Sequence, residues 1–192
     1  MPLTKIKSLG ITDGTILGTD VNSTFDLTGK TVTLPAGTGG KVLQVVTQFY
    51  DTQTSINSSS FTDTGLSLSI TPASTSNKVL VSFYPSFSTS SGAYPAFKLF
   101  RGTTEIGSST VTGTGLECFT GHYGHSTFNY SIISLPIVYL DSPSTTSVTT
   151  YKLQVSPMRT SSEQFYLNRS HTLGDDNQYR TVSNVILMEI AG

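Results

Sequence analysis

The only cysteine of this chain and two of its three histidines fall within one short segment. Cys118, His122 and His125 have the spacing C-x3-H-x2-H, and Glu117 precedes the cysteine. Thiolate, imidazole and carboxylate groups are the ligands that zinc binds in proteins, and the spacing of the two histidines occurs in such sites. The segment supplies only one such pair, so a complete site would need a further ligand from His171 or from another subunit.

The same residues could instead form a nucleophile pair, in which a histidine accepts the thiol proton of Cys118. The sequence offers no residue that would orient the histidine and no glycine-rich turn that would form a pocket beside it. A lone cysteine is also a small apolar residue that often lies in a core. We therefore expect an exposed loop with no catalytic residue, no cofactor and no bound metal. Copies of one histidine from several subunits would be the alternative route to an ion site.

The composition of the whole chain indicates a β protein. Charged residues are 12% of the 192 residues, tryptophan is absent, and serine and threonine make up roughly 30%. Abundant Thr, Val, Ile, Tyr and Phe suit a pleated, half-buried surface, and the low charge argues against disorder. The net charge of −1 and the lack of a basic run argue against nucleic-acid binding, and no apolar run suffices to enter a membrane.

Residues 1–40 differ from the rest of the chain. They are rich in glycine and have no helical periodicity, and only the segment KTVTLP resembles a strand. A segment with so few apolar residues cannot bury much surface by itself, so we expect an extended arm that orders against a partner. We expect a β domain over residues 41–192. The candidate anchoring residues of the arm are its larger apolar ones: Ile6, Ile11, Ile16, Leu17, Val21 and Phe25.

Alternation of apolar and polar residues becomes strong after Lys41. Leu66, Leu68 and Ile70 alternate with serines, as in a sheet with one buried face. Similar segments recur to the end of the chain, separated by stretches rich in Ser, Thr, Gly and Pro. Pro136 interrupts one of them, which indicates a bulge or an edge strand. Many short strands of this kind predict a sandwich, a barrel or a jelly roll.

The last strand-like segment, VILMEI at residues 185–190, is apolar on both faces apart from Glu189. A strand that is apolar on both faces must be covered on both. A second sheet can cover one face, but a single domain of this size has little left to cover the other. A neighbouring subunit would supply that cover, so the segment indicates an oligomer.

Four stretches in a fixed order resemble the head domains of bacteriophage fibre-type virion proteins, which are common in marine and cyanobacterial phages. They are residues 59–87, 98–107, 140–155 and 183–192. The order is also similar to the jelly roll of C1q and tumour necrosis factor, which combines a strand like Lys78–Phe83 with a hairpin like Leu99–Ile106. The resemblance implies an all-β jelly-roll sandwich that forms a homotrimer and is assembled on the virion.

The resemblance also implies a structural role without catalysis. The arm would attach a short fibre to tail, baseplate or capsid proteins, and the knob would bind a glycan or protein of the host surface. The loop from Gly113 to Phe128 is the candidate receptor-binding segment, and Tyr94 is a further aromatic residue near a loop. Its contact residues would be His122, Tyr123, His125 and Phe128. Because the chain has no room for a shaft, decoration of the capsid by a head fibre or cement protein is the alternative.

Overall fold

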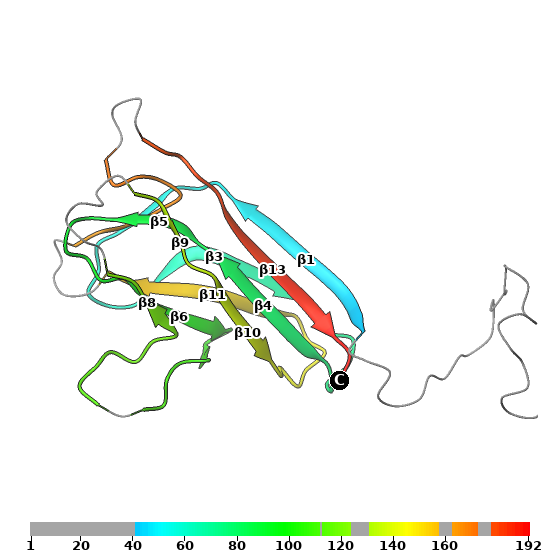
Figure 1. Ribbon diagram of the computed structural model, residues 1–192. Coiled ribbons are helices and arrows are strands. Elements are labelled where there is room, and N and C mark those ends of the chain that lie inside the picture. The colour runs from blue at the N-terminus through cyan, green and yellow to red at the C-terminus, as the bar shows by residue number, and fades with distance from the viewer. Residues whose placement is uncertain (1–40, 112, 124–130, 158–162, 173–177) are drawn as a thin grey trace, which may run out of the picture. The chain divides into compact units, whose positions relative to one another are not determined.

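Figure 1 shows the computed structural model of the chain, which describes residues 41–111, 113–123, 131–157, 163–172 and 178–192. Within these ranges the regular secondary structure consists of β-strands alone, so the prediction of an all-β protein is confirmed. The described residues accordingly contain no helix long and apolar enough to cross a lipid bilayer. The predicted arm over residues 1–40 lies outside the described residues.

The strands of the described residues follow the alternation of the sequence, although the pattern does not predict the short strands β2 and β8. Most of them lie where the sequence has β-branched and aromatic residues, which fit a pleated surface. The strands are β1 (Val42–Tyr50), β2 (Thr54–Ile56), β3 (Thr62–Ile70), β4 (Lys78–Tyr84), β5 (Ser86–Thr89), β6 (Ala96–Arg101), β7 (Thr104–Ile106), β8 (Thr120–Gly121), β9 (Ile133–Ser134), β10 (Ile137–Asp141), β11 (Thr149–Ser156), β12 (Phe165–Leu167) and β13 (Ser183–Ile190).

The strands form three antiparallel sheets. The β1 sheet has the order β1-β13-β4-β10, and the β3 sheet has the order β3-β11-β6-β7 with β8 beside β6. The short β2 sheet has the order β2-β12-β5-β9. In the two larger sheets the pairing is nested, because β1 pairs with β13, β3 with β11, β4 with β10 and β6 with β7. The first and last of these strands therefore lie side by side (Figure 1).

One apolar core lies between the β1 sheet and the β3 sheet, as in a β-sandwich. Val81 and Leu187 of the β1 sheet and Leu66 and Leu153 of the β3 sheet are fully or almost fully buried in it. Burying each such side chain stabilises the fold by roughly 1.5–3 kcal/mol. The cluster continues into three mutually packed phenylalanines, Phe87, Phe97 and Phe165, whose ring centroids are 5.2–5.7 Å apart.

Gly102 and Pro136 lie in two short connections between strands. Leu99–Ile106 forms the predicted hairpin, in which Arg101 faces Thr104 and Gly102 adopts a φ of 58° that favours glycine. Pro136 lies between β9 and β10, each of which is the last strand of its sheet. The expectation of an edge at this proline is confirmed, because an edge strand does not need the N–H that proline lacks.

The outer face of the β1 sheet, turned away from the core, is mostly apolar. The strand register aligns Val45, Met188, Leu80 and Leu140 in one row across all four strands. Val45 is 54% exposed and Leu140 is 47% exposed. The adjoining rows add further apolar side chains, and Lys78 is the only charged residue on this face of the four strands. The predicted two-sided apolar character of β13 is thus confirmed, and its outer half is uncovered in one chain.

The outer face of the β3 sheet is polar by contrast. Lys152 pairs with Asp63 across 3.0 Å, and Lys98 pairs with Glu105 across 2.8 Å. Gln154 donates a further hydrogen bond of 2.7 Å to the Asp63 carboxylate. Such exposed ion pairs contribute little to stability, but they show a face that suits water. The two outer faces of the sandwich therefore have opposite character.

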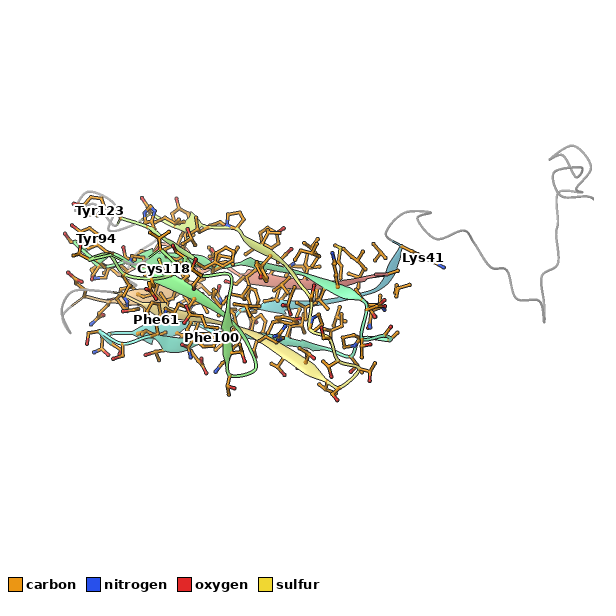
Figure 2. The ribbon with its side chains drawn as sticks, turned by 90° about the horizontal axis from the view of Figure 1, so that it is seen from below. Lys41, Phe61, Tyr94, Phe100, Cys118 and Tyr123 are labelled. Carbon is orange, nitrogen blue, oxygen red and sulfur yellow. The ribbon has the colours of Figure 1, made fainter. Side chains whose placement is uncertain are left out.

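We call one end of the sandwich the base. It contains Lys41 and Gly192, because the Ala191 N–H donates to the Lys41 carbonyl across 2.9 Å. Figure 2 places Tyr94 and Tyr123 at the opposite end, called the far end. The chain enters the sandwich and completes it at the base, and the far end is formed by connections between strands.

Glu189 joins three parts of the chain at the base. Its side chain is 1% exposed and points from β13 toward the interior. The carboxylate accepts hydrogen bonds of 2.6 Å each from the Gln44 side chain on β1 and from the Ala73 N–H and Asn77 side chain in the β3–β4 turn. Burial alone would raise the pKa of Glu189, but these donors outweigh it and hold the pKa below its ordinary value.

We predict that Glu189→Gln lowers the free energy of unfolding at pH 7 by roughly 2–3 kcal/mol, because the new amide group faces hydrogen-bond donors. The folded pKa of Glu189 lies below the unfolded value of about 4.3. The unfolded chain therefore takes up the proton first as the pH falls, so the contribution of Glu189 is complete above about pH 4.3 and is lost below it. Urea unfolding of both proteins across this pH range measures the effect.

Asp63→Asn is the matched control, because Asp63 is a carboxylate with a lowered pKa on the exposed outer face of the β3 sheet. Loss of the Asp63 charge is expected to lower the free energy of unfolding by about 0.5 kcal/mol. Equal destabilisation by the two substitutions would show that the carboxylate at the base has no special part in stability.

Candidate functional site

The segment that contains the cysteine and histidines is fixed to the sandwich at its C-terminal part. β8 pairs with the beginning of β6, and the Phe119 N–H donates to the Phe97 carbonyl across 2.8 Å. The Phe119 ring packs edge-on against Tyr139 of the other sheet at 6.3 Å. Gly107, at a φ of 75°, lies so close that a Cβ there would be 2.6 Å from the ring. Phe119 therefore closes one side of the sandwich between β7 and β10.

Cys118 and His122 lie on either side of this attachment and have different surroundings. The half-buried Cys118 lies near the charges of Lys98 and Glu105 on the outer face of the β3 sheet. The His122 ring instead packs edge-on against Phe87 of the core at 6.2 Å. Burial raises the pKa of the Cys118 thiol, which keeps it protonated and weakens it as a nucleophile and as a metal ligand. These surroundings favour a structural cysteine.

The geometry of the described residues gives no support to a metal site in this segment. Among them, no three His, Cys, Asp or Glu side chains come close enough to hold an ion. His125 lies outside the described residues. The zinc alternative could therefore only involve residues beyond the described part of the chain or a second subunit.

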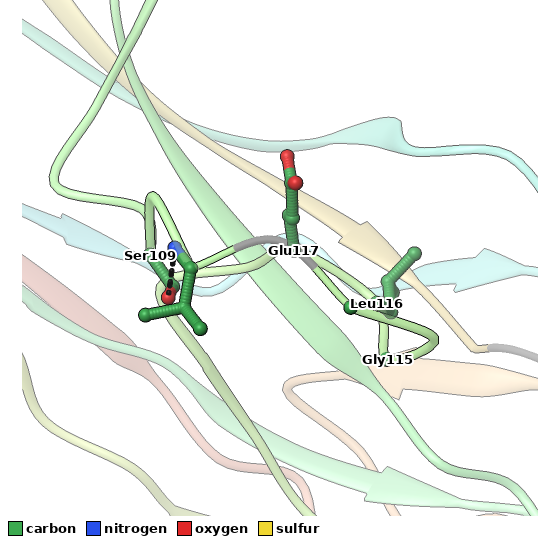
Figure 3. Close-up of a pocket in the computed structure, with 6 residues that line it drawn as sticks. Ser109, Gly115, Leu116 and Glu117 are labelled. Atoms are coloured by element: carbon green, nitrogen blue, oxygen red, sulfur yellow. Dashed lines mark hydrogen bonds between the residues drawn. The ribbon is translucent and has the colours of Figure 1, made fainter.

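A pocket of about 260 Å³ lies within the preceding loop (Figure 3). Glu117 is the only ionisable residue among those that line it, and the Val111 N–H donates to the Ser109 hydroxyl across 3.2 Å. No histidine, lysine or second carboxylate of the described residues lines the pocket beside this exposed carboxylate, so the lining gives no support to general acid–base chemistry. The pocket is lined by Ser109, Val111, Gly113, Gly115, Leu116 and Glu117.

The far end carries a pair of aromatic rings from two separate connections. The rings of Tyr94 and Tyr123 lie 4.6 Å apart, and Tyr123 is 53% exposed. Backbone hydrogen bonds position both residues: the Tyr94 N–H donates to the Pro157 carbonyl across 2.8 Å, and the His122 N–H donates to Pro95 across 2.9 Å. A pair formed by the exposed Tyr123 and the half-buried Tyr94 offers an aromatic contact surface at a low cost in conformational entropy.

The predicted contact residues thus divide into three groups. Tyr123 is exposed at the far end, and His122 lies beside it but is half-buried against the core. His125 and Phe128 lie outside the described residues. The sequence identified Tyr94 and Tyr123 separately as loop aromatics, but it contains no signal that they pair, because 28 residues separate them along the chain.

The six arm residues of the anchoring prediction also lie outside the described residues, so that prediction stays a prediction. They are Ile6, Ile11, Ile16, Leu17, Val21 and Phe25.

No protein-family model matches this chain, and no curated protein matches it closely enough to be a relative.

Proposed function

We propose that this chain is a non-enzymatic structural protein of a virus particle. In this proposal it forms a homotrimeric short fibre of the bacteriophage type, anchored by residues 1–40, and its far end binds the host surface. The observation that carries the proposal is the contrast between the two outer faces of the sandwich. One face is apolar and uncharged enough to pack on another copy, and the other is lined with ion pairs. The setting on a virion rests on the resemblance described above.

The strand order supports the jelly-roll part of the proposal. A jelly roll has eight strands in two sheets, related by two Greek keys. Counting only the strands of the two larger sheets, apart from β8, the pairs are first with last, second with seventh, third with sixth and fourth with fifth. A long antiparallel ribbon that is wrapped into two sheets has this nested pairing. We therefore assign the sandwich to the jelly-roll class.

The outer face of the β1 sheet supports a contact between copies. Phe49 is 70% exposed, and Val138 is 49% exposed. Exposed apolar patches that extend over several strands are typical of interfaces between proteins. A second copy of this chain is a suitable occupant, because a face with so little charge can approach an identical face without electrostatic repulsion. The threefold symmetry of the proposed assembly comes from the resemblance.

The positions of the two ends of the sandwich support separate roles, with attachment at the base and target binding at the far end. Residue 40 directly precedes the base, where β1 starts beside the end of β13. The paired tyrosines lie at the far end (Figure 2). In a trimer built on the β1 sheets, the three bases would share one end and the three far ends would share the other. This arrangement suits a protein that is attached at one end and contacts its target at the other.

We predict that Met188→Glu dissociates the trimer into folded monomers at micromolar concentration. Met188 lies half-buried on the outer face of the central strand β13, between Val45 and Leu80. Burying an unpaired carboxylate at an interface costs several kcal/mol per copy, whereas on an exposed face it costs little. Sedimentation velocity gives the mass, and circular dichroism verifies that the β structure is retained.

Ser69→Glu is the control for the same change of charge, because Ser69 lies exposed on the outer face of the β3 sheet. This variant is expected to remain a trimer. A wild-type protein that sediments as a monomer would contradict the oligomeric part of the proposal.

We predict that the double substitution Tyr94→Ala and Tyr123→Ala reduces adsorption of particles to host cells by at least about tenfold. Truncating a tyrosine at the centre of an interface often costs about 2 kcal/mol, and a trimer multiplies the loss across its linked sites. The measurement is the rate at which mutant particles are removed from suspension by cells. The control is Val148→Ala, which removes an exposed apolar side chain from a separate loop, outside the paired tyrosines. Unchanged adsorption by the double mutant would exclude this pair as a receptor contact.

Capsid decoration is the second candidate, because the apolar outer face of the β1 sheet could also be covered by a capsid protein. The number of copies per virion separates the two functions. A fibre of the tail or baseplate is expected in few copies, whereas a decoration protein is expected in many copies that scale with the number of capsid subunits. Quantitative mass spectrometry of purified particles measures the number of copies per virion. A copy number that scales with the number of capsid subunits would show a decoration protein and contradict the fibre.

A further inference from the structure

Two arginines face each other at the far end of the sandwich. Arg169, two residues after β12, and Arg180, three residues before β13, form an isolated antiparallel bridge. The Ser170 N–H donates to the Tyr179 carbonyl, and the Thr181 N–H donates to the Asn168 carbonyl, each across 3.0 Å. These bonds flank the arginine pair, so the pair is of the non-hydrogen-bonded type, in which the Cα atoms approach to about 4.5 Å and the side chains are closest. Both side chains leave the same face of the bridge.

The backbone beneath the bridge is rigidly held. Asn168 is fully buried and has a φ of 59°. Its side-chain amide donates to the carbonyls of Tyr50 and Thr52 across 2.9 Å each, and the Ser183 hydroxyl donates to its oxygen across 2.6 Å. The two strands of the bridge are therefore tied to β1 and β13.

The guanidinium of Arg169 is fixed in one orientation. Its Nε donates to the Ser170 carbonyl and its Nη2 donates to the His171 carbonyl, both across 3.0 Å. The same group lies 4.9 Å above the ring of Tyr166. These contacts use two of the five N–H donors of the guanidinium, so three donors have no hydrogen-bond partner among the described residues. A pre-oriented guanidinium with free donors matches a carboxylate or phosphate.

Neither arginine has a counter-charge among the described residues, and Asp175 and Asp176, in the loop between them, lie outside those residues. The three ion pairs of the described residues involve Lys98, Arg101 and Lys152, and neither arginine of the bridge takes part in any. The exposed Arg180 side chain forms no hydrogen bond or ion pair with a described residue. Like charges that face each other across a strand pair destabilise it. An anion bound between the two arginines would remove that repulsion.

The Arg169 guanidinium and the His171 ring contact the same side chain, that of Tyr166. The His171 ring packs against Tyr166 at 5.2 Å. Burial, together with the charge of Arg169, lowers the pKa of His171, so its imidazole is neutral at pH 7 and can both donate and accept a hydrogen bond. Aromatic surface beside charged and neutral polar groups is the usual composition of a binding site for a small polar ligand.

We propose that Arg169 and Arg180 bind the acidic group of a surface saccharide, either a carboxylate or a phosphate. The proposal rests on the proposed function, because it specifies the class of host ligand that the far end would recognise. Arg169 supplies a fixed guanidinium and Arg180 supplies a second, movable one. The neutral imidazole of His171 can exchange hydrogen bonds with sugar hydroxyls.

The test is a titration of the full chain, followed by NMR of the arginine Nε–Hε signals and by calorimetry. The probes are a trimer of galacturonic acid, galactose 6-phosphate, and the neutral trimer of galactose. We expect at least one acidic probe to bind about tenfold or more tightly than the neutral trimer. Raising the salt concentration should weaken this binding, because the attraction is between charges. Binding of only one acidic probe identifies whether the site takes a carboxylate or a phosphate.

Arg180→Gln is the informative variant, because the exposed Arg180 side chain supports no other part of the fold. The variant should stay folded, with a thermal stability equal to or slightly above that of the wild type, since one of two facing like charges is removed. It is expected to weaken binding of the acidic probe about tenfold, whereas Lys78→Gln, which removes an exposed cation at the base, should leave binding unchanged. Equal binding of acidic and neutral probes would overturn the proposal, as would an Arg180→Gln protein that binds like the wild type. Either result leaves the adsorption test of the tyrosine pair independent, so failure of this site differs from failure of the proposed function.

Discussion

The sandwich depends on the position of β13, the last strand of the described chain, between β1 and β4 in the middle of a sheet. Within this sheet β1 is joined to β4 and β10 only through β13, and every strand pair of the sheet joins residues far apart in sequence. Glu189 stabilises β13 in this position, because its carboxylate accepts hydrogen bonds from β1 and from the β3–β4 turn. Folds with such non-local pairing form slowly, and their unpaired edges are exposed until the final strand is in place.

The same strand couples the core to the proposed assembly. Val185 and Leu187 point into the core, while Ile186 and Met188 point outward to the uncovered face. A change in the position of β13 would therefore alter the interior packing and the contact surface together. A folded monomer would carry a large apolar face in water, so the proposed association would add to the stability of the folded chain.

The sequence predicts the strands well and the site poorly, for a physical reason. Alternation is a property of adjacent residues, so β3 and β13 can be recognised from residues 66–70 and 185–190 alone. The nested pairing could be expected only through a resemblance, because the alternation pattern does not specify which strands pair. The tyrosine pair joins two connections, and the arginine bridge joins residues 169 and 180 on either side of a loop. Such contacts depend on the tertiary arrangement, and nothing in the local sequence marks them.

The separation of the two ends has a consequence for how this protein could change over generations. Residues at the base, such as Glu189, are tied to the core, and most substitutions there would reduce the yield of folded protein. Tyr123 and Arg180 at the far end are exposed, and their backbones are held by neighbouring main-chain hydrogen bonds. Their side chains can be replaced with little loss of folding free energy. If the far end binds a ligand as proposed, selection could therefore alter that ligand while the scaffold stays the same.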